Sequence, residues 1–181
     1  MNYCDFCQQL PKDNMHRIYH DSIYGFVCSN DDELFGRLIL EINQAGLSWE
    51  IILKKEPNFR KAYANYSIPE IAGFTKAKVT ELLENPEIVR NKLKISAIIL
   101  NAQTVLALQK KYGTFSAWLD SHHPSSLDQW QYLFKKTFKF TGREIVSEFL
   151  LSSGYLKGAH SESCATFVLI KSTIPKWLSY E

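Results

Sequence analysis

The sequence predicts an all-α protein, and three observations support that prediction. Apolar residues recur three or four positions apart over most of the chain, which is the spacing that places side chains on one face of a helix. No segment alternates apolar and polar residues convincingly with period two, so strands are at most minor. Helix-ending residues separate the apolar segments, as in Asn85-Pro86, Gly113 and Gly154.

Capping residues mark where the helices are expected to begin. Asp31 or Asp32 precedes the first clear helix, and Ser48 precedes the second, which fades towards Pro57. Thr75 opens a later helix with an apolar side. The expected helices cover residues 33–43, 49 to about 56, 75–85, 91–111, a short turn around Trp118, 127–134 and 144–153.

Two segments carry weaker signals. Ser67 and Glu70 have the spacing of a capping box, with a proline tolerated in the first turn. Residues 1–30 are crowded with Cys, His and Tyr and are expected to be irregular.

Composition suits one domain covering residues 1–181, with a helical core over about residues 31–153. The chain has 181 residues, of which 45% are hydrophobic and 22% are charged, and it contains no internal repeat or linker. The net charge of +2 demands no nucleic-acid partner, so any basic surface must be local. No apolar run is long enough to cross a bilayer, and the N-terminus has no signal-peptide pattern. We therefore expect a cytoplasmic protein whose four cysteines are metal ligands or core residues rather than disulfides.

The corner after the first helix is the most informative stretch. Helical spacing carries Glu41 round to the apolar side of its helix. Ala45-Gly46 then breaks the helix, which leaves Leu47 on a tight turn before Trp49. A carboxylate, a projecting leucine and a tryptophan thus meet at one corner. The pattern alone favours an ordinary helix corner with a packed Leu and Trp.

A metal site is suggested by His160 and Cys164, which are four residues apart and can face one ion on a single helical turn. Cys4 and His20 can complete a tetrahedral Zn²⁺ set that leaves no open position, which would make the metal structural. The spacing alone favours free thiols and unrelated histidines instead. Competing ligands are Cys7, Cys28, His16, His122 and His123.

Basic residues suggest a local DNA-binding surface. Residues 75–111 resemble a helical hairpin whose second helix begins beside Arg90, Lys92 and Lys94, and a helix N-terminus flanked by cations binds phosphate. A second basic run, interleaved with aromatic residues, covers residues 135–143. Solvated helix faces and snorkelling lysines are the alternative interpretation of both.

Taken together and in this order, these pieces resemble the DNA-3-methyladenine glycosylase I family of helix-hairpin-helix DNA glycosylases. The QAGLSW block at residues 44–49 and the split Cys/His set are its most specific motifs. The matching residues are Cys4, Tyr19-His20-Asp21, Gly25, Leu34-Phe35, Glu41, residues 44–49, residues 53–55, Asn58, Phe59, Arg60, residues 88–90, Lys94-Ile95, residues 97–99, Asn101-Ala102, residues 139–142, His160 and Cys164.

The resemblance implies a monofunctional enzyme that flips 3-methyladenine out of alkylated double-stranded DNA and hydrolyses its glycosidic bond. It implies a structural Zn²⁺ that joins the terminal segments, about residues 1–30 and 154–181, and a monomer without membrane contact. Phe6 and Tyr24 stand where family members often have tryptophan. The implied roles are metal binding by Cys4, His20, His160 and Cys164; base recognition by Glu41, Tyr19 and Trp49; pocket lining by Phe6, Tyr24 and Gln44; a DNA wedge at Leu47; and backbone contacts from Arg90, Lys92 and Lys94.

Three other functions are weighed against this one. A zinc hydrolase is disfavoured because four protein ligands close the metal site. A non-catalytic, zinc-stabilised DNA-binding module would have no use for Glu41 beside Trp49. A glycosylase of the same family with a different or broader range of alkylated bases is the strongest rival.

Overall fold

The computed structural model describes residues 2–180, and every regular element in that part of the chain is a helix, which confirms the all-α prediction. Within the same residues, no helix is both long enough and apolar enough to cross a membrane. The α-helices are α1 (Tyr3–Gln8), α2 (Met15–Ser22), α3 (Asp31–Gln44), α4 (Trp49–Ala62), α5 (Ile68–Ala72), α6 (Lys76–Glu84), α7 (Lys92–Tyr112), α8 (Phe115–Asp120), α9 (Leu127–Thr137), α10 (Arg143–Ser152) and α11 (Ala165–Ser172), and the 3₁₀ helices are η1 (Ala64–Tyr66) and η2 (Lys176–Tyr180).

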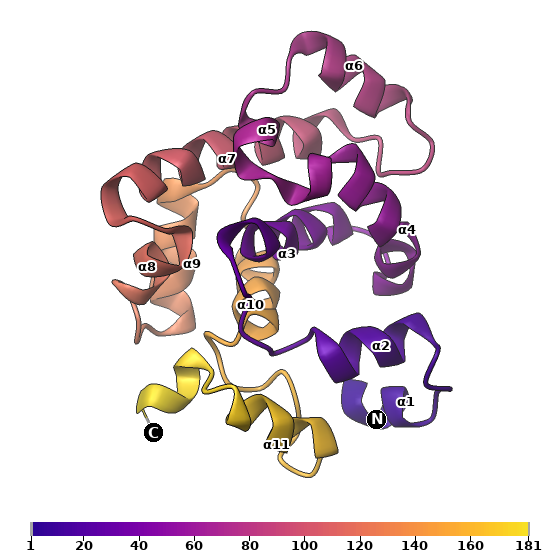
Figure 1. The fold of residues 1–181 in the computed structure, drawn as a ribbon, viewed down its shortest axis with the longest axis vertical. Helices are drawn as coiled ribbons and strands as arrows, with labels where there is room; N and C mark the ends of the chain where they lie inside the picture. Colours follow the sequence, from indigo (N-terminus) through magenta and orange to yellow (C-terminus); the bar gives the residue numbers. More distant parts are fainter. Residues whose placement is uncertain (1, 181) are drawn as a thin grey trace.

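Helix α3 is the element around which the others pack. It lies at the centre of the molecule, with α10 beside it, α4 to α7 on one side and the terminal segments on the other (Figure 1). Its side chains at Phe35, Leu38, Ile39 and Ile42 are fully buried in the main hydrophobic core. A separate, small apolar cluster joins Cys4, Cys164 and Phe167 at the ends of the chain. The fold therefore has a large core around α3 and a second, terminal one.

The cap of α3 differs from the sequence prediction. Asn30 occupies the N-cap position and its side chain accepts a hydrogen bond from the Glu33 N–H, so neither aspartate caps this helix. Asp31 instead accepts from the N–H groups of Phe115 and Ser116 at the start of α8 (2.6 and 3.1 Å). Asp32 accepts from the Ile68 N–H at the start of α5. Two carboxylates in the first turn of α3 thus accept hydrogen bonds from N–H groups at the starts of two other helices, a long-range use that local sequence cannot reveal.

The N-terminal region is helical where an irregular segment was expected. Asn2 and Asn14 cap α1 and α2, and each side chain accepts a hydrogen bond from a backbone N–H in the first turn. Both helices are short and carry few aliphatic residues, so apolar periodicity did not reveal them. They pack against each other and bring Cys4 and His20 towards the C-terminal segment.

Helix α4 passes through Pro57, where the sequence analysis expected it to fade. Proline lacks an N–H, so it removes one hydrogen bond inside the helix. Burial of Ile52 and Phe59 on either side offsets that loss, and Arg60 donates to Glu56 across the proline (3.1 Å). The expected capping box at Ser67 is also absent: its side chain makes no cap hydrogen bond, and Asp32 takes over that role.

The helices from α6 to α10 follow the prediction closely, whereas α11 was not predicted. Thr75, Asn91 and Thr114 cap α6, α7 and α8 through their side chains. Gly113 follows α7 at φ +91°, a left-handed conformation that glycine adopts without strain. Helix α9 runs to Thr137, three residues beyond the expected end at Phe134, because Phe134 is buried and Thr137 Oγ1 bonds the Leu133 carbonyl.

Candidate functional site

The corner between α3 and α4 has the predicted form. α3 ends at Gln44, and Gly46 turns the chain at φ +79°. The Leu47 N–H donates to the Gln44 carbonyl (2.7 Å), which tightens the turn. Ser48 takes the N-cap position of α4 without a side-chain cap bond. Leu47 therefore projects from a tight corner, and its 38% exposure leaves it free to meet a partner.

Lys94 does not lie where a DNA phosphate could reach it, which corrects the sequence prediction. Its side chain is 4% exposed, and burial lowers the pKa of its amine. The ammonium group donates to the carbonyls of Asn43 and Ala45 (2.7 and 2.6 Å), which are left unpaired where α3 ends. Lys94 thus holds the corner that carries Leu47. Arg90 and Lys92 are exposed, as the prediction requires.

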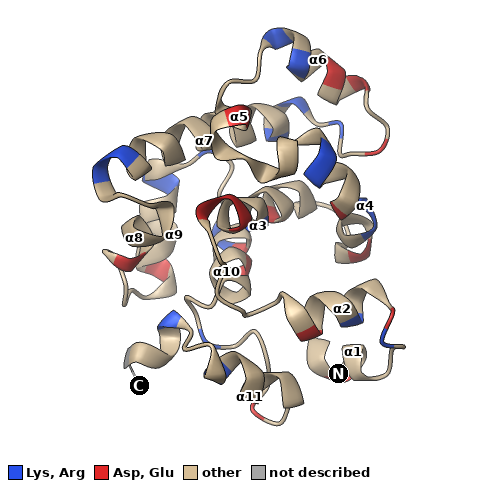
Figure 2. Ribbon diagram, viewed as in Figure 1, with Lys and Arg blue, Asp and Glu red and all other residues tan. Residues whose placement is uncertain are grey.

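Charge across the molecule is dispersed. Figure 2 shows lysines and arginines on α4, α6, α7 and further elements, interspersed with acidic residues. Exposed Arg90 and Lys92 lie where the chain enters α7. A phosphate contact would thus be local to that connection, consistent with the low net charge.

A cavity of about 240 Å³ lies beside the corner and contains most of the predicted pocket residues. The Tyr19 ring meets Trp49 edge-on at 5.0 Å between centroids and lies 5.6 Å from Tyr24. Aromatic faces therefore dominate the lining, as a site for a planar base requires. The lining residues are Tyr3, Tyr19, Tyr24, Glu41, Gln44, Trp49 and Glu148.

Phe6 is not among the residues that line this cavity. Its ring stacks on Tyr3 at 6.3 Å between centroids and meets His16 edge-on at 5.4 Å, so it packs against a lining residue. Sequence reasoning missed Tyr3, which lies one helical turn from Phe6, and Glu148, which α10 contributes from the far end of the chain. No local pattern marks Glu148, because only the packing of α10 against α3 brings it to the cavity.

Glu41 is the buried carboxyl group of the site. It is 4% exposed, and no described residue donates a hydrogen bond to its carboxyl group. Burial raises the pKa of Glu41 well above its usual range; the negative charge of Glu148 raises it further, while Arg37 opposes the shift. Glu41 is consequently an acceptor held ready for a ligand that brings a positive charge or a donor.

A second cavity, of about 540 Å³, lies between α2, α3 and α4 and shares Tyr19, Glu41 and Trp49 with the first. This second cavity is larger, but Gln44 does not line it. Gln44 lines the smaller cavity, which therefore lies next to the corner. We therefore take the smaller cavity, here called the base pocket, as the candidate site.

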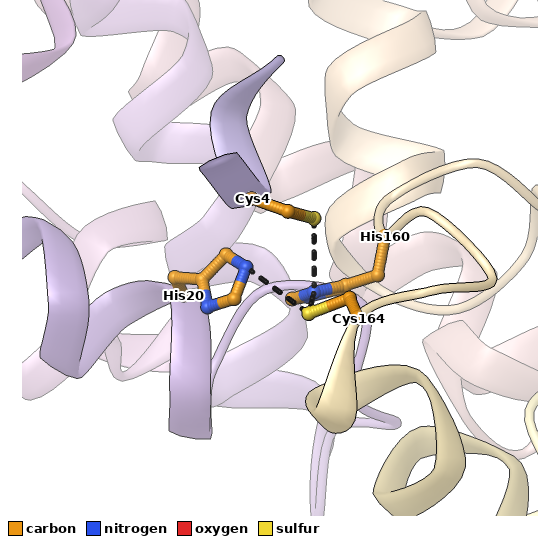
Figure 3. A group of neighbouring side chains, drawn as sticks. All are labelled: Cys4, His20, His160 and Cys164. Atoms are coloured by element: carbon orange, nitrogen blue, oxygen red, sulfur yellow. Dashed lines mark hydrogen bonds between the residues drawn. The ribbon is translucent and has the colours of Figure 1, made fainter. Parts of the chain in front are cut away.

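The four predicted metal ligands come together at the two ends of the chain (Figure 3). Their ligand atoms lie within 4.8 Å of one another, and all four residues are buried. The Sγ of Cys164 is 3.7 Å from both His20 Nε2 and His160 Nδ1, and Cys4 Sγ is 3.7 Å from His160 Nδ1. A zinc tetrahedron with bonds of about 2.3 Å to sulfur and about 2.0 Å to nitrogen separates S and N by about 3.5 Å. The residues present fit such an ion.

Neighbouring groups orient the two imidazoles. Asp21 Oδ1 lies 2.6 Å from His20 Nδ1, and the Tyr24 carbonyl lies 2.9 Å from His160 Nε2. The outer nitrogens, His20 Nδ1 and His160 Nε2, thus each have an acceptor. The inner nitrogens, His20 Nε2 and His160 Nδ1, face the cysteines and can bind a metal. Burial lowers the pKa of His160 to about 4, so its ring is neutral at physiological pH. All four cysteines are free thiols.

The local structure around His160 and Cys164 differs from the prediction. The pair was expected on one helical turn, but residues 161–164 form a turn in which the Cys164 N–H donates to the Ser161 carbonyl. Cys164 is the N-cap residue of α11. The turn brings both ligands to one point, so the ligand set is as predicted although the helix is not.

The four predicted ligands Cys4, His20, His160 and Cys164, here called the metal-ligand cluster, adjoin the base pocket. Tyr19 and His20 are consecutive in α2, and Tyr24 lines the pocket with its ring while its carbonyl contacts His160. The cluster therefore holds one aromatic wall of the pocket in place.

Comparison with known proteins gives consistent matches over most of the chain. A sequence model described as methyladenine glycosylase matches residues 9–132. DNA-3-methyladenine glycosylase 1 of Escherichia coli strain K12 is 28% identical over 180 residues, covering 89% of this chain and 96% of that protein. A solved variant of 3-methyladenine DNA glycosylase I in complex with 3-methyladenine has a TM-score of 0.81 at 30% identity, covering 92% of this chain and 97% of that one. The Staphylococcus aureus 3-methyladenine DNA glycosylase I, solved to explain 3-methyladenine recognition, has a TM-score of 0.80 at 29% identity, covering 91% and 97%.

Proposed function

The chain belongs to the methyladenine glycosylase family, and from that premise we propose that it removes 3-methyladenine from alkylated double-stranded DNA. The observation that carries this proposal is the buried Glu41 carboxyl, which has no hydrogen-bond donor among the described residues and faces an aromatic cavity beside an exposed leucine turn. A buried acceptor without a partner is costly unless a ligand supplies the donor.

Access to the base requires extrusion from the duplex. A base inside the stack cannot be reached, and flipping it out costs a few kcal/mol, least for damaged bases. Leu47 projects from the corner beside the pocket and would fill the space that the flipped nucleotide leaves. Lys94 fixes the carbonyls of that corner, so the leucine is presented on a rigid turn.

Recognition follows from the charge of the lesion. Methylation at N3 gives adenine a positive charge, which the π faces of Tyr19 and Trp49 and the acceptor oxygens of Glu41 favour. Normal adenine is neutral and gains much less from the same groups. The pocket therefore selects the base by its charge as well as by its shape.

The same charge drives the bond cleavage. The C1′–N9 bond breaks with its electron pair moving to the base, which neutralises the methylated ring. Water then adds to C1′ and releases its proton. No lysine is among the residues that line the base pocket, which supports a monofunctional enzyme without a Schiff-base step.

We propose Zn²⁺ as the occupant of the cluster formed by Cys4, His20, His160 and Cys164. Two thiolates and two imidazoles suit that ion, and four protein ligands leave no position for a substrate. The metal would be structural, joining α1 and α2 to the segment before α11. Metal analysis should give about one zinc per chain, as a closed tetrahedral site requires.

For DNA binding we propose the helix-hairpin-helix formed by α6, residues 85–91 and α7. Arg90 and Lys92 are exposed at the turn, where they would contact phosphates. Asn91 Oδ1 accepts a hydrogen bond from the Lys94 N–H. The side-chain cap thus occupies one backbone N–H group at the start of α7. A monomer located in the cytoplasm remains a prediction from the sequence.

The test is to incubate the purified protein with methylated duplex DNA and to identify the released bases by chromatography. Release of 3-methyladenine, with no strand cleavage by the protein, is the expected result. Release of other alkylated bases in preference to it would favour the broader-range alternative. Absence of any released base would reject the enzymatic function.

A further inference from the structure

Glu148 is a pocket residue that the mechanism above leaves without a role. It comes from α10, more than a hundred residues beyond Glu41, and both side chains line the base pocket. Two ionised carboxylates in one small cavity repel each other, and this repulsion raises the pKa of Glu41. A second carboxyl group in a small aromatic cavity therefore needs an explanation.

Tyr24 fixes the orientation of this second carboxyl group. Its hydroxyl donates to Glu148 Oε2 at 3.0 Å. A phenol has a single proton, so the Tyr24 oxygen can only accept a hydrogen bond from anything else that enters the cavity. Burial raises the pKa of Tyr24, which keeps that proton in place. The pocket accordingly presents three acceptor groups, at Glu41, Glu148 and Tyr24.

Nearby cations do not neutralise this acceptor surface. The Arg37 guanidinium moderates the charge of Glu41, but its Nη1 already donates to the carbonyls of Phe26 and Ser152. Burial raises the pKa of Glu148, and the negative charge of Glu144 adds to the shift. Two carboxyl groups thus share the pocket, and the pKa of each is raised. A cationic ligand would relieve their repulsion.

Resting on the proposed function, we propose that Glu148 is a second specificity-determining residue that accepts hydrogen bonds from the flipped base. With Glu41 it forms a pair of carboxyl acceptors on two elements, which selects cationic alkylated purines that carry donors over neutral bases. Glu41 alone would accept hydrogen bonds from one edge of the base. Glu148 would accept from another edge and would further favour a positively charged base over a neutral one.

The test compares three variants in single-turnover excision of 3-methyladenine. Glu148→Gln keeps the volume and an oxygen that can accept from Tyr24, but it removes the charge. Tyr24→Phe removes the Tyr24 hydroxyl and leaves the charge. Glu144→Gln, exposed and one helical turn before Glu148, makes the same charge change at a residue that does not line the pocket. Affinity for DNA with an abasic site is measured for each as a control for fold and DNA binding.

Loss of a charge-assisted hydrogen bond should slow excision by Glu148→Gln about tenfold or more, with abasic-site affinity unchanged. Glu144→Gln should match the wild type, and Tyr24→Phe should lose less than Glu148→Gln. Full activity in Glu148→Gln together with a loss in Tyr24→Phe would mean that Glu148 only positions Tyr24, and would overturn the proposal. Equal losses in the two charge variants would also overturn it. A wild type that releases no base would instead reject the proposed function itself.

Discussion

The metal-ligand cluster and the base pocket are neighbours built from similar buried polar groups, yet their partners differ. In the cluster, sulfur and nitrogen atoms lie 3.7 Å apart, and the outer nitrogens of His20 and His160 both have acceptors. In the pocket, the Glu41 carboxyl has no donor among the described residues, and its electrostatic neighbour Glu148 carries the same charge. The two histidines of the cluster thus have protein acceptors for their outer nitrogens, whereas the Glu41 carboxyl group has no protein donor and is available to a ligand.

The largest effect is expected from breaking the cluster. Cys164→Ala removes one of four ligands, so metal binding, which is coupled to folding, should be lost together with about 10 °C of thermal stability. Metal content and thermal unfolding are the measurements. Cys28→Ala, a free thiol outside the cluster, is the matched control and should keep its metal. A metal-free wild type of full stability would contradict this prediction.

Glu41→Gln should have the next largest effect, a loss of activity that does not come from a loss of stability. The variant keeps the shape but replaces an acceptor oxygen with a donor, so single-turnover release of 3-methyladenine should fall by about a hundredfold. Affinity for abasic-site DNA should change little, because no base occupies the pocket in that complex. Equal losses in both measurements would make Glu41 structural.

The same variant gives a pH signature. Because folding raises the pKa of Glu41, the folded state holds the proton more tightly than the unfolded state. The wild type therefore loses stability as pH rises from the ordinary value of 4.5 through the raised pKa of the folded state. Glu41→Gln lacks this loss, so it should be more stable than the wild type at neutral pH and level with it below 4.5. Denaturant unfolding across this range is the measurement, and a constant difference at all pH values would count against the assignment.

Lys94→Met sharpens the comparison at the corner itself. The methionine keeps the buried stem but leaves the carbonyls of Asn43 and Ala45 unpaired, which should cost about 2 kcal/mol of stability. Excision should slow as well, since the corner that carries Leu47 loosens. Lys92→Met, two residues earlier and exposed, should leave stability unchanged while weakening DNA binding at low salt. Equal stability of the two variants would show that the corner does not depend on Lys94.

The smallest effect is expected from Leu47→Gly, about a tenfold slower excision from duplex DNA with the fold intact. The wedge contributes only when a base leaves a stacked duplex, so release from single-stranded DNA should be unaffected. The ratio of duplex to single-strand rates is the measurement. An unchanged ratio would leave Leu47 as an ordinary corner residue.

Sequence patterns predicted most of the fold because capping and apolar spacing are local signals. The starts of α6, α7 and α8 and the turn at Gly46 follow directly from them. Long-range polar contacts were not predictable in the same way. Asp31 and Asp32 read as caps of their own helix but bond other helices.

The residues of the candidate site likewise fall into those that local motifs predicted and those whose positions depend on long-range packing. Tyr19 and Trp49 belong to the motifs at residues 19–21 and 44–49, and Glu41 precedes the second motif. The structure brings the three side chains together at one cavity. Lys94 was misassigned because an amphipathic helix start does not show whether a lysine points outward or towards the end of another helix. Glu148 was missed because its place depends on how α10 packs against α3.

The four residues of the metal-ligand cluster come from opposite ends of the helical core in the sequence, so they are synthesised at different times. Cys4 and His20 leave the ribosome before the helical core, whereas His160 and Cys164 follow it. The ligand set is therefore incomplete until the core has been synthesised, and a chain interrupted earlier cannot acquire the closed site. A completed cross-link over this span would restrict the unfolded chain by about 5 kcal/mol in the loop-entropy model. A metal bound by these four residues would therefore reach its full ligand set only after the helical core between them has been synthesised.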